Sequence, residues 1–233
     1  MITFCLSYYN QPKEVLIRHI NYWRKYPDNI KKILQFFIID DCSKIPAHEL
    51  LDKDDLNGLN ISIYRINEDK FCNTGGVRNL GASECKTPYL LILDMDTSVD
   101  NKMISNIMPL CEENINNNIV FKFNRKRINN KTIEDCSRPH PAICLIRKKD
   151  YWNIGGCDED MVGNWGCTDP TFWARAGNKV KIEIKRNIYL MTYKDGEVNC
   201  KKNAKLNEAL LREKIKNNSF SDEILRFTWN KVY

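Results

Sequence analysis

Short apolar runs alternate with longer amphipathic stretches along the first two hundred residues of this chain. Apolar runs of strand length lie at residues 2–7, 34–39, 61–66 and 89–93. After the first of them, apolar residues recur at helical spacing over residues 11–26. Strands that alternate with helices are typical of a βαβ arrangement. We therefore expect an α/β fold in which a mixed, mostly parallel central sheet is flanked by helices.

The later part of this region continues the alternation. Helices are expected over residues 77–85, 103–111 and 171–176. Further strands are expected at residues 119–123, 142–146 and 180–184, the last with the alternating pattern of an edge strand. Because no repeat or low-complexity linker interrupts the pattern, residues 1–200 are predicted to form one domain.

The composition becomes helical and charged after Cys200. One side of the expected helix is an apolar stripe of Leu206, Leu210, Leu211 and Ile215. Amphipathic helices usually bury such a stripe, so we expect it to dock on the core; a dimer contact or a membrane surface are the alternatives. Ser221 is expected to cap a last helix that runs through Trp229. Residues 201–233 are thus predicted to form a helical tail packed on the core.

Acidic residues stand where two of the expected strands end. Residues 90–97 read LLILDMDT, so a buried strand delivers Asp94 and Asp96 into a loop. Residues two apart in an extended chain face the same side, and two convergent carboxylates suit Mg or Mn. A solvated turn is the alternative. Because ligands of open α/β sheets bind beyond the carboxyl ends of the strands, this position favours a ligand site.

Two further segments have residue types that suit a nucleotide. Residues 36–43, FFIIDDCS, also end a strand in acids, and a carboxylate there suits the imide N–H of uracil or that of guanine. A turn or a helix cap is the alternative. In residues 73–82, NTGGVRNLGA, two glycines open a helix with Arg78 in its first turn. Exposed amides and a guanidinium suit a phosphate, and a structural ion pair of Arg78 is the alternative.

A fourth segment combines glycines, acids and tryptophans. Residues 151–160 read YWNIGGCDED, and residues 165–173 read WGCTDPTFW. Asp169, just before a short helix, is a candidate general base or simply the cap of that helix. Aromatic faces stack on sugar C–H groups, and the candidate walls of a sugar site are Trp152, Trp165 and Trp173, which would otherwise be core residues.

Composition narrows the classes of function. The 233 residues are 42% hydrophobic and 28% charged with a net charge of +6, which argues against a disordered chain and against a strongly basic nucleic-acid binder. The ten cysteines contain no C-x-x-C pair, so buried free thiols are expected in place of a zinc ribbon. No secretory signal and no apolar run near ~20 residues is found, so a cytoplasmic location is expected.

The order of these motifs resembles that of family 2 glycosyltransferases of GT-A fold, over residues 1–190. The resemblance rests on TFCLSYYN, IIDDCS, the glycine–arginine helix start, LDMDT and the GGCDED…TDPTFW block. It implies that the nucleotide is bound by Ser7, Tyr9, Asp41, Arg78 and Asp94. It also implies that Asp96 and Asp94 bind Mn²⁺ or Mg²⁺, and that Asp169 is the catalytic base.

Two departures from the family pattern stand out. Thr168 replaces the Glu that precedes the catalytic Asp. No histidine matches a late metal ligand of the family, since the region reads IYLMTYKDGE, and Tyr193, Asp195 or diphosphate oxygens and water are the expected substitutes. The residues expected to contact the acceptor are Asp158, Glu159, Asp160, Trp165 and His140, with a structural role of His140 as the alternative.

These features favour an inverting glycosyltransferase that uses a nucleotide-sugar donor, most simply a UDP-sugar. The expected acceptor is a hydroxyl of a glycan, a protein or a lipid-linked sugar, and neither a nucleic-acid partner nor a transmembrane segment is expected. Direct displacement needs one carboxylate base, whereas retention needs a nucleophile that cannot be placed in this sequence. A metal-dependent nucleotidyltransferase and a non-catalytic sugar-nucleotide-binding protein are the alternatives.

Overall fold

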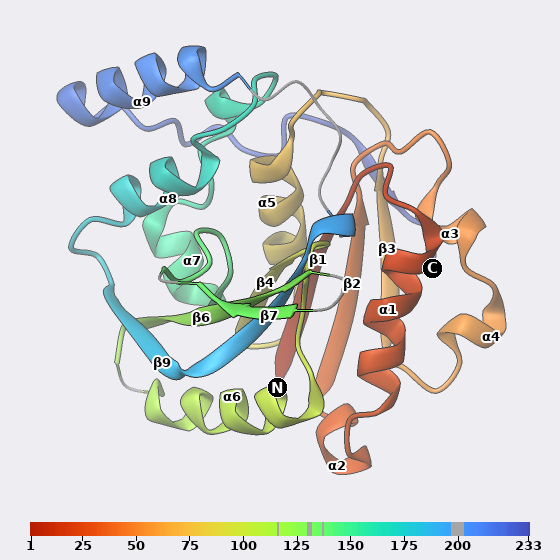
Figure 1. Cartoon of the computed structure of the whole chain (residues 1–233). Helices are drawn as coiled ribbons and strands as arrows, with labels where there is room; N and C mark the ends of the chain where they lie inside the picture. The colour runs from red at the N-terminus through yellow and green to blue at the C-terminus, as the bar shows by residue number, and fades with distance from the viewer. Residues whose placement is uncertain (116, 130–131, 137, 197–202) are drawn as a thin grey trace.

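The computed structural model describes residues 1–115, 117–129, 132–136, 138–196 and 203–233. Their strands form one sheet in the order β10-β3-β2-β1-β4-β8-β6-β9-β5, with β7 paired to β6 (Figure 1). Four adjacent parallel strands form one half of it, namely β3 (Ile61–Ile66), β2 (Leu34–Asp40), β1 (Ile2–Tyr8) and β4 (Tyr89–Asp94). This mixed sheet confirms the predicted α/β fold.

The other strands extend the sheet on both sides. β10 (Trp229–Lys231) pairs antiparallel with β3. Beyond β4 lie β8 (Cys144–Arg147), β6 (Ile119–Asn129), β9 (Lys181–Tyr193) and β5 (Thr97–Ser98), and β7 (Thr132–Asp135) forms a hairpin with β6. The strand expected at residues 180–184 is therefore longer than predicted, because it continues along β6 and reaches β5.

Helices cover both faces of the sheet. α1 (Lys13–Arg24) and α6 (Asn101–Glu113) contribute to one buried apolar cluster, and α5 (Thr74–Glu84), α7 (Lys148–Ile154) and α8 (Thr168–Ala176) to a second on the opposite face (Figure 1). β1 and β2 are buried on both faces, which explains their continuous apolar runs. The short helices are α2 (Asp28–Lys31), α3 (Ala47–Leu50), α4 (Lys53–Leu56), η1 (Glu159–Met161) and η2 (Lys194–Gly196).

The tail differs from its prediction in two ways. α9 (Lys205–Asn217) forms, but it buries the polar residues Asn207 and Lys214, while Leu206 and Ile215 of the expected docking stripe are exposed. The prediction of a helix from Ser221 to Trp229 is wrong, because residues 221–228 form neither helix nor strand and Trp229 begins β10. Polar contacts and a strand pairing, and not an apolar helix face, attach the tail to the core.

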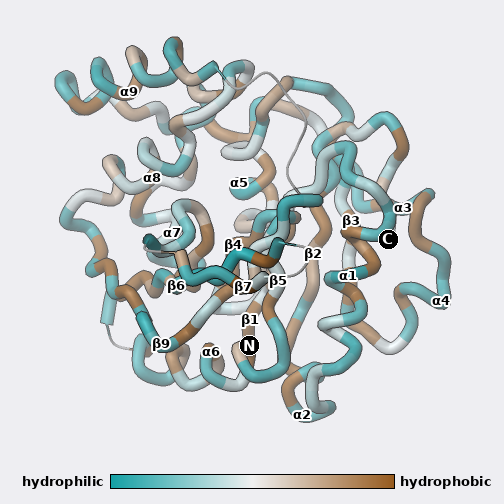
Figure 2. The backbone as a smooth tube through the Cα atoms, viewed as in Figure 1, coloured by the Kyte–Doolittle hydropathy of each residue, from teal (hydrophilic) through white to brown (hydrophobic). Residues whose placement is uncertain are grey.

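Figure 2 shows where the hydrophobic residues concentrate. They lie mainly along the central strands and the helix faces turned to the sheet, whereas the backbone around β7 is hydrophilic. Five cysteines are buried in the apolar clusters as free thiols, namely Cys5, Cys85, Cys111, Cys144 and Cys157. Within the described residues, no helix has both the length and the apolar character needed to span a bilayer.

Candidate active site

A cavity of about 690 Å³ lies beyond the carboxyl ends of β1, β2 and β4. The start of α5, the loop before α8 and part of β6 complete its wall. Nine of the residues singled out in the sequence line it, namely Ser7, Tyr9, Asp41, Arg78, Asp94, Asp96, His140, Trp165 and Asp169. The parallel register explains part of this gathering, because Ser7 lies opposite Asp94 across β1 and β4.

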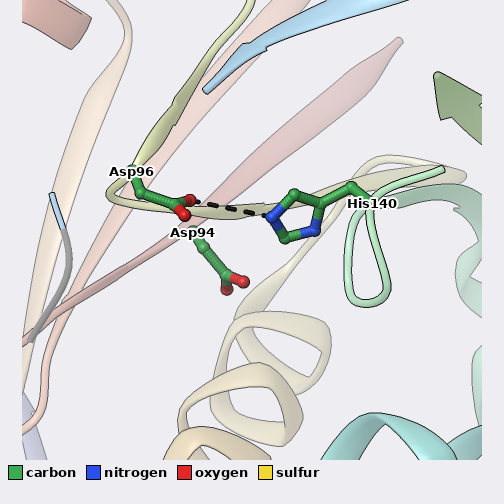
Figure 3. Close-up of side chains that lie close together, drawn as sticks. All are labelled: Asp94, Asp96 and His140. Atoms are coloured by element: carbon green, nitrogen blue, oxygen red, sulfur yellow. Dashed lines mark ion pairs between the residues drawn. The ribbon is translucent and has the colours of Figure 1, made fainter. Parts of the chain in front are cut away.

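Asp94, Asp96 and His140 form the only group of three ligand side chains within the described residues that could share one metal ion (Figure 3). One ligand atom from each lies within 4.8 Å of the others, and His140 Nε2 is 3.8 Å from Asp96 Oδ1. Asp94 ends β4, Asp96 follows it in the turn to β5, and His140 lies in the segment before β8. The carboxylate oxygens of Asp94 and Asp96 suit Mn²⁺ or Mg²⁺.

The backbone assigns the tautomer of His140. Its Nδ1 lies 3.3 Å from the amide nitrogens of both Ala142 and Ile143, which donate to it. The proton of the neutral ring therefore sits on Nε2, which faces Asp96. Burial acts against the charge of Asp96, but this contact with His140 outweighs it and holds the pKa of the carboxyl below its ordinary value. His140 thus orients Asp96 as a donor.

Arg78 connects Asp94 and Asp169, two of the acids that line the cavity. Its Nη1 donates to Asp169 Oδ1 at 2.6 Å, and its Nη2 donates to Asp94 Oδ1 at 3.2 Å. The arginine is buried in α5, and its neighbouring carboxylates raise its pKa further despite burial, so it stays charged. Burial raises the pKa of Asp94, opposed by the Arg78 charge. The ion pair considered as an alternative is therefore part of the site.

Asp169 is not the cap of α8. The helix begins at Thr168 after Cys167, which has a left-handed backbone with φ of 63°, and no side chain caps this end. Asp169 lies in the first turn, 23% exposed, with its Oδ1 on Arg78. Among the described residues, no hydrogen bond to its Oδ2 is found, so one oxygen is available in the cavity. This geometry suits a general base.

Asp40 and Asp41 have different environments although they are adjacent. Asp40 accepts hydrogen bonds from the Ser43 and Ala47 amides and pairs with Arg65, so it holds the local fold. Asp41 lines the cavity, accepts from Asn73 Nδ2 at 3.1 Å, and burial raises its pKa to about 7.

Ser7 and Tyr9 are close to the same end of the cavity as Asp41. The Ser7 hydroxyl is buried and has no hydrogen-bond partner within the described residues, so a ligand can occupy its bonding capacity. The Tyr9 hydroxyl donates to Asp69 at 3.2 Å. Together these side chains offer one unused hydroxyl and one protonatable carboxyl to a nucleobase or ribose.

The acids at 158–160 lie elsewhere, contrary to the acceptor role expected for them. The cavity wall, as far as it is described, does not include them. Asp158 binds Lys214 and the Ser221 amide, Asp160 binds Lys214, and Glu159 accepts from Asn79 and from two backbone amides of the tail. Asp158 and Glu159 are buried. Their charges attach the C-terminal segment to the core.

The substitutes expected for the late histidine are also engaged elsewhere. The Tyr193 hydroxyl lies 2.7 Å from that of Tyr22, and Asp195 pairs with Arg18 at 2.6 Å. Of the three tryptophans, Trp165 lines the cavity, whereas Trp173 donates its Nε1–H to the Pro141 carbonyl. A histidine does lie next to Asp96, but it is His140, which precedes β8, and not a residue of the later segment where the family has its histidine.

Arg125 and Arg127 were not singled out in the sequence, yet both line the cavity. They lie two residues apart on β6, within the run FKFNRKRIN. The sequence does contain a relevant pattern, because two arginines at alternate positions of a strand lie on the same face. Basic residues on a hairpin are so often solvated that the pattern alone does not point to a site.

The fold and this site define an α/β protein with a cavity and paired acids at a strand end. The model of glycosyl transferase family 2 matches residues 3–176, and the chain belongs to this family. No curated protein matches the sequence significantly.

Solved structures share the fold at low identity. The S. aureus TarS 1-349 crystal structure matches with a TM-score of 0.64 and 14% identity, over 82% of this chain and 60% of that one. TarS 1-349 in complex with UDP-GlcNAc gives 0.65 and 14%, over 83% and 58%. GalNAc-T7 with UDP, GalNAc and Mn²⁺ gives 0.67 and 14%, over 83% and 44%. The present chain thus spans about 60% or less of these structures.

Proposed function

We propose that the protein is an inverting glycosyltransferase that transfers a sugar from a UDP-sugar to an acceptor hydroxyl. The observation that carries the proposal is the Arg78 bridge, because it holds a candidate base, Asp169, and a candidate metal ligand, Asp94, in one cavity. UDP and Mn²⁺ bound to structures of the same fold support the donor and the cation. The acceptor is a glycan, a protein or a lipid-linked sugar.

The donor nucleoside would lie at the end of the cavity formed by Ser7, Tyr9 and Asp41. Asp41 and Ser7 offer the polar groups that a uracil or ribose needs. Asp94 and Asp96 would hold Mn²⁺ or Mg²⁺, with His140 orienting Asp96. The chemistry that such a cation supplies when bound is neutralisation of charge on a leaving diphosphate.

Asp169 would act on the acceptor. Its carboxylate takes the proton of the acceptor hydroxyl, whose oxygen forms a bond to the anomeric carbon. The bond from that carbon to the diphosphate breaks, and its electron pair leaves with the nucleoside diphosphate. Arg78 keeps Asp169 in place through Oδ1, which leaves Oδ2 for the proton. A single base with no second nucleophile gives inversion at the anomeric carbon.

The test is the variant Asp169→Asn, measured for release of UDP from UDP-sugars in the presence of Mn²⁺. Asn is close in size and still accepts from Arg78, so fold and UDP binding should be kept. Loss of the base should lower turnover by about 10²- to 10⁴-fold. Thr171→Ser, a conservative change in the same helix, serves as the control. If Asp169→Asn retains turnover, Asp169 is not the base. If the protein instead releases pyrophosphate from a nucleoside triphosphate, a nucleotidyltransferase is favoured.

A further inference from the structure

Two arginines of the cavity wall have no carboxylate partner among the residues that the structure describes. Arg125 and Arg127 line the cavity, and neither forms an ion pair with any described residue. The Nε of Arg125 is buried and lacks a hydrogen-bond partner within the described part of the chain. A buried guanidinium nitrogen without an acceptor is costly, so a ligand that supplies acceptors is expected there.

The acids nearby are already engaged. Among the cavity carboxylates, Asp94 and Asp169 bind Arg78, and Asp41 accepts from Asn73. Asp96 accepts from the Thr97 hydroxyl and faces His140. On the paired strand β7, Asp135 forms its ion pair with Lys126 at 3.4 Å. Glu134 lies opposite Arg127 in the strand register but is exposed, and no ion pair joins the two. The guanidinium groups of Arg125 and Arg127 are therefore available to bind a negatively charged ligand in the cavity.

Their location fixes what kind of anion is expected. Arg127 lies opposite Thr192 of β9, and Thr192 in turn lies opposite Thr97, the residue that follows Asp96, so this part of β6 lies on the side of the paired acids. A planar guanidinium presents parallel N–H groups that match phosphate oxygens. Two such groups on one strand face, two residues apart, suit a ligand that carries two adjacent phosphates.

We propose that Arg125 and Arg127 bind the diphosphate of the nucleotide-sugar donor from the β6 side of the cavity. The inference rests on the proposed function and adds a second phosphate-binding element to it. In this arrangement the arginines hold the donor before transfer and offset the charge of the nucleoside diphosphate after it. β6 would therefore be part of the donor site.

The test compares UDP with uridine, because only UDP carries the diphosphate. Arg125→Gln, Arg127→Gln and the double variant are titrated with UDP by calorimetry and with uridine by ligand-observed NMR. Each single variant should weaken UDP binding about tenfold to a hundredfold and leave uridine binding unchanged. Lys126→Gln is the matched control, since this residue lies between them and pairs with Asp135 instead. It should bind UDP like the wild-type protein.

The outcomes separate this inference from the proposed function. Equal UDP affinity in the double variant and the wild type would overturn the inference and leave the glycosyltransferase proposal intact. Unchanged UDP affinity with a raised KM for phosphate-bearing acceptors would also overturn it, by assigning the arginines to the acceptor. No UDP binding by wild-type protein would overturn both. If the glutamine variants unfold, Arg125→Lys and Arg127→Lys keep the charge without the planar group and should still weaken UDP binding several-fold.

Discussion

The side-chain amide nitrogen of Asn207 lies 2.8 Å from the carbonyl oxygen of Gly166, 41 residues earlier in the chain. The same nitrogen also approaches the carbonyls of Met161 and Asn164, at 2.9 and 3.0 Å. Gly166 and its neighbour Trp165 line the cavity. One buried amide of α9 therefore fixes the loop that forms the wall next to Asp169.

Replacing Asn207 should loosen that loop. In Asn207→Ala the carbonyls lose their shared donor, and we expect unfolding free energy to fall by about 1–3 kcal/mol. Hydrogen exchange in residues 161–167 should accelerate, while UDP affinity stays constant. Leu206→Ala, an exposed neighbour on the same helix, should change neither quantity. Unaltered exchange in Asn207→Ala would show that other contacts hold the loop.

Lys214 is the main ionic attachment of the tail. Its Nζ lies 2.9 Å from Asp158 Oδ2 and 2.7 Å from Asp160 Oδ2, and it is almost fully buried. Lys214→Met leaves Asp158 buried without its cation, so stability in urea should fall by about 3–5 kcal/mol. Lys216→Met, on the exposed side of α9, should be close to neutral. Similar midpoints for both variants would contradict this role.

The stability contributed by Asp41 should depend on pH. Burial raises its pKa in the folded state to about 7 from 3.8, so the folded protein binds more protons than the unfolded chain between these values. The free energy of unfolding therefore falls as pH rises through this window, and the full destabilisation by the buried Asp41 carboxylate is present above pH 7. Asp41→Asn should be more stable than wild type at pH 8 by up to about 4 kcal/mol, and by much less at pH 5.

Urea denaturation at both pH values measures this difference. Asp54→Asn makes the same chemical change at an exposed site and should show no such pH dependence. A gain in Asp41→Asn that is equal at pH 5 and pH 8 would contradict the raised pKa. Because Asp41 lines the part of the cavity proposed to bind the nucleoside, the stabilised variant should also bind UDP less tightly.

Metal affinity should depend on His140 and not on Asp195. Without the imidazole, Asp96 loses its orienting donor, and we expect Mn²⁺ affinity of His140→Ala to fall about tenfold to a hundredfold. Asp195 is engaged with Arg18, so Asp195→Asn should bind Mn²⁺ normally. Titration of Mn²⁺ followed by electron paramagnetic resonance distinguishes the two. Weaker binding in Asp195→Asn alone would favour the late acid as a ligand.

Much of the fold follows from local patterns. Continuous apolar runs predicted β1 to β4, since strands buried on both faces contain few polar residues. The tail was misjudged because the apolar stripe of α9 suggested the buried face, whereas the acids at 158–160 bind Lys214 instead. The buried face of α9 is determined by ion pairs between residues 54 or more positions apart, and the hydrophobic periodicity of the helix gives no information about such pairs.

The residues of the candidate site also differ in whether local sequence patterns could predict them. Asp94 and Asp96 were recognisable because one strand end delivers both. The contact of Arg78 with Asp169 spans 91 residues, so it depends on how α5 and α8 pack on the sheet. The proximity of His140 to Asp96 and the position of the two β6 arginines in the cavity wall could not be predicted for the same reason, because both depend on how distant segments pack together.

The pairing of β10 with β3 places Trp229 opposite Ile66 and so closes a loop that contains most of the chain. Closing so long a loop is slow, since it brings no compensating contacts until its ends meet. In the segment just before β10, the backbone N–H groups of Leu225 and Arg226 donate hydrogen bonds to the Glu159 carboxylate. The Phe227 ring packs against Gly76 at the start of α5. The end of the chain thus supports the start of α5, whose residues Thr74, Val77 and Arg78 form part of the cavity wall.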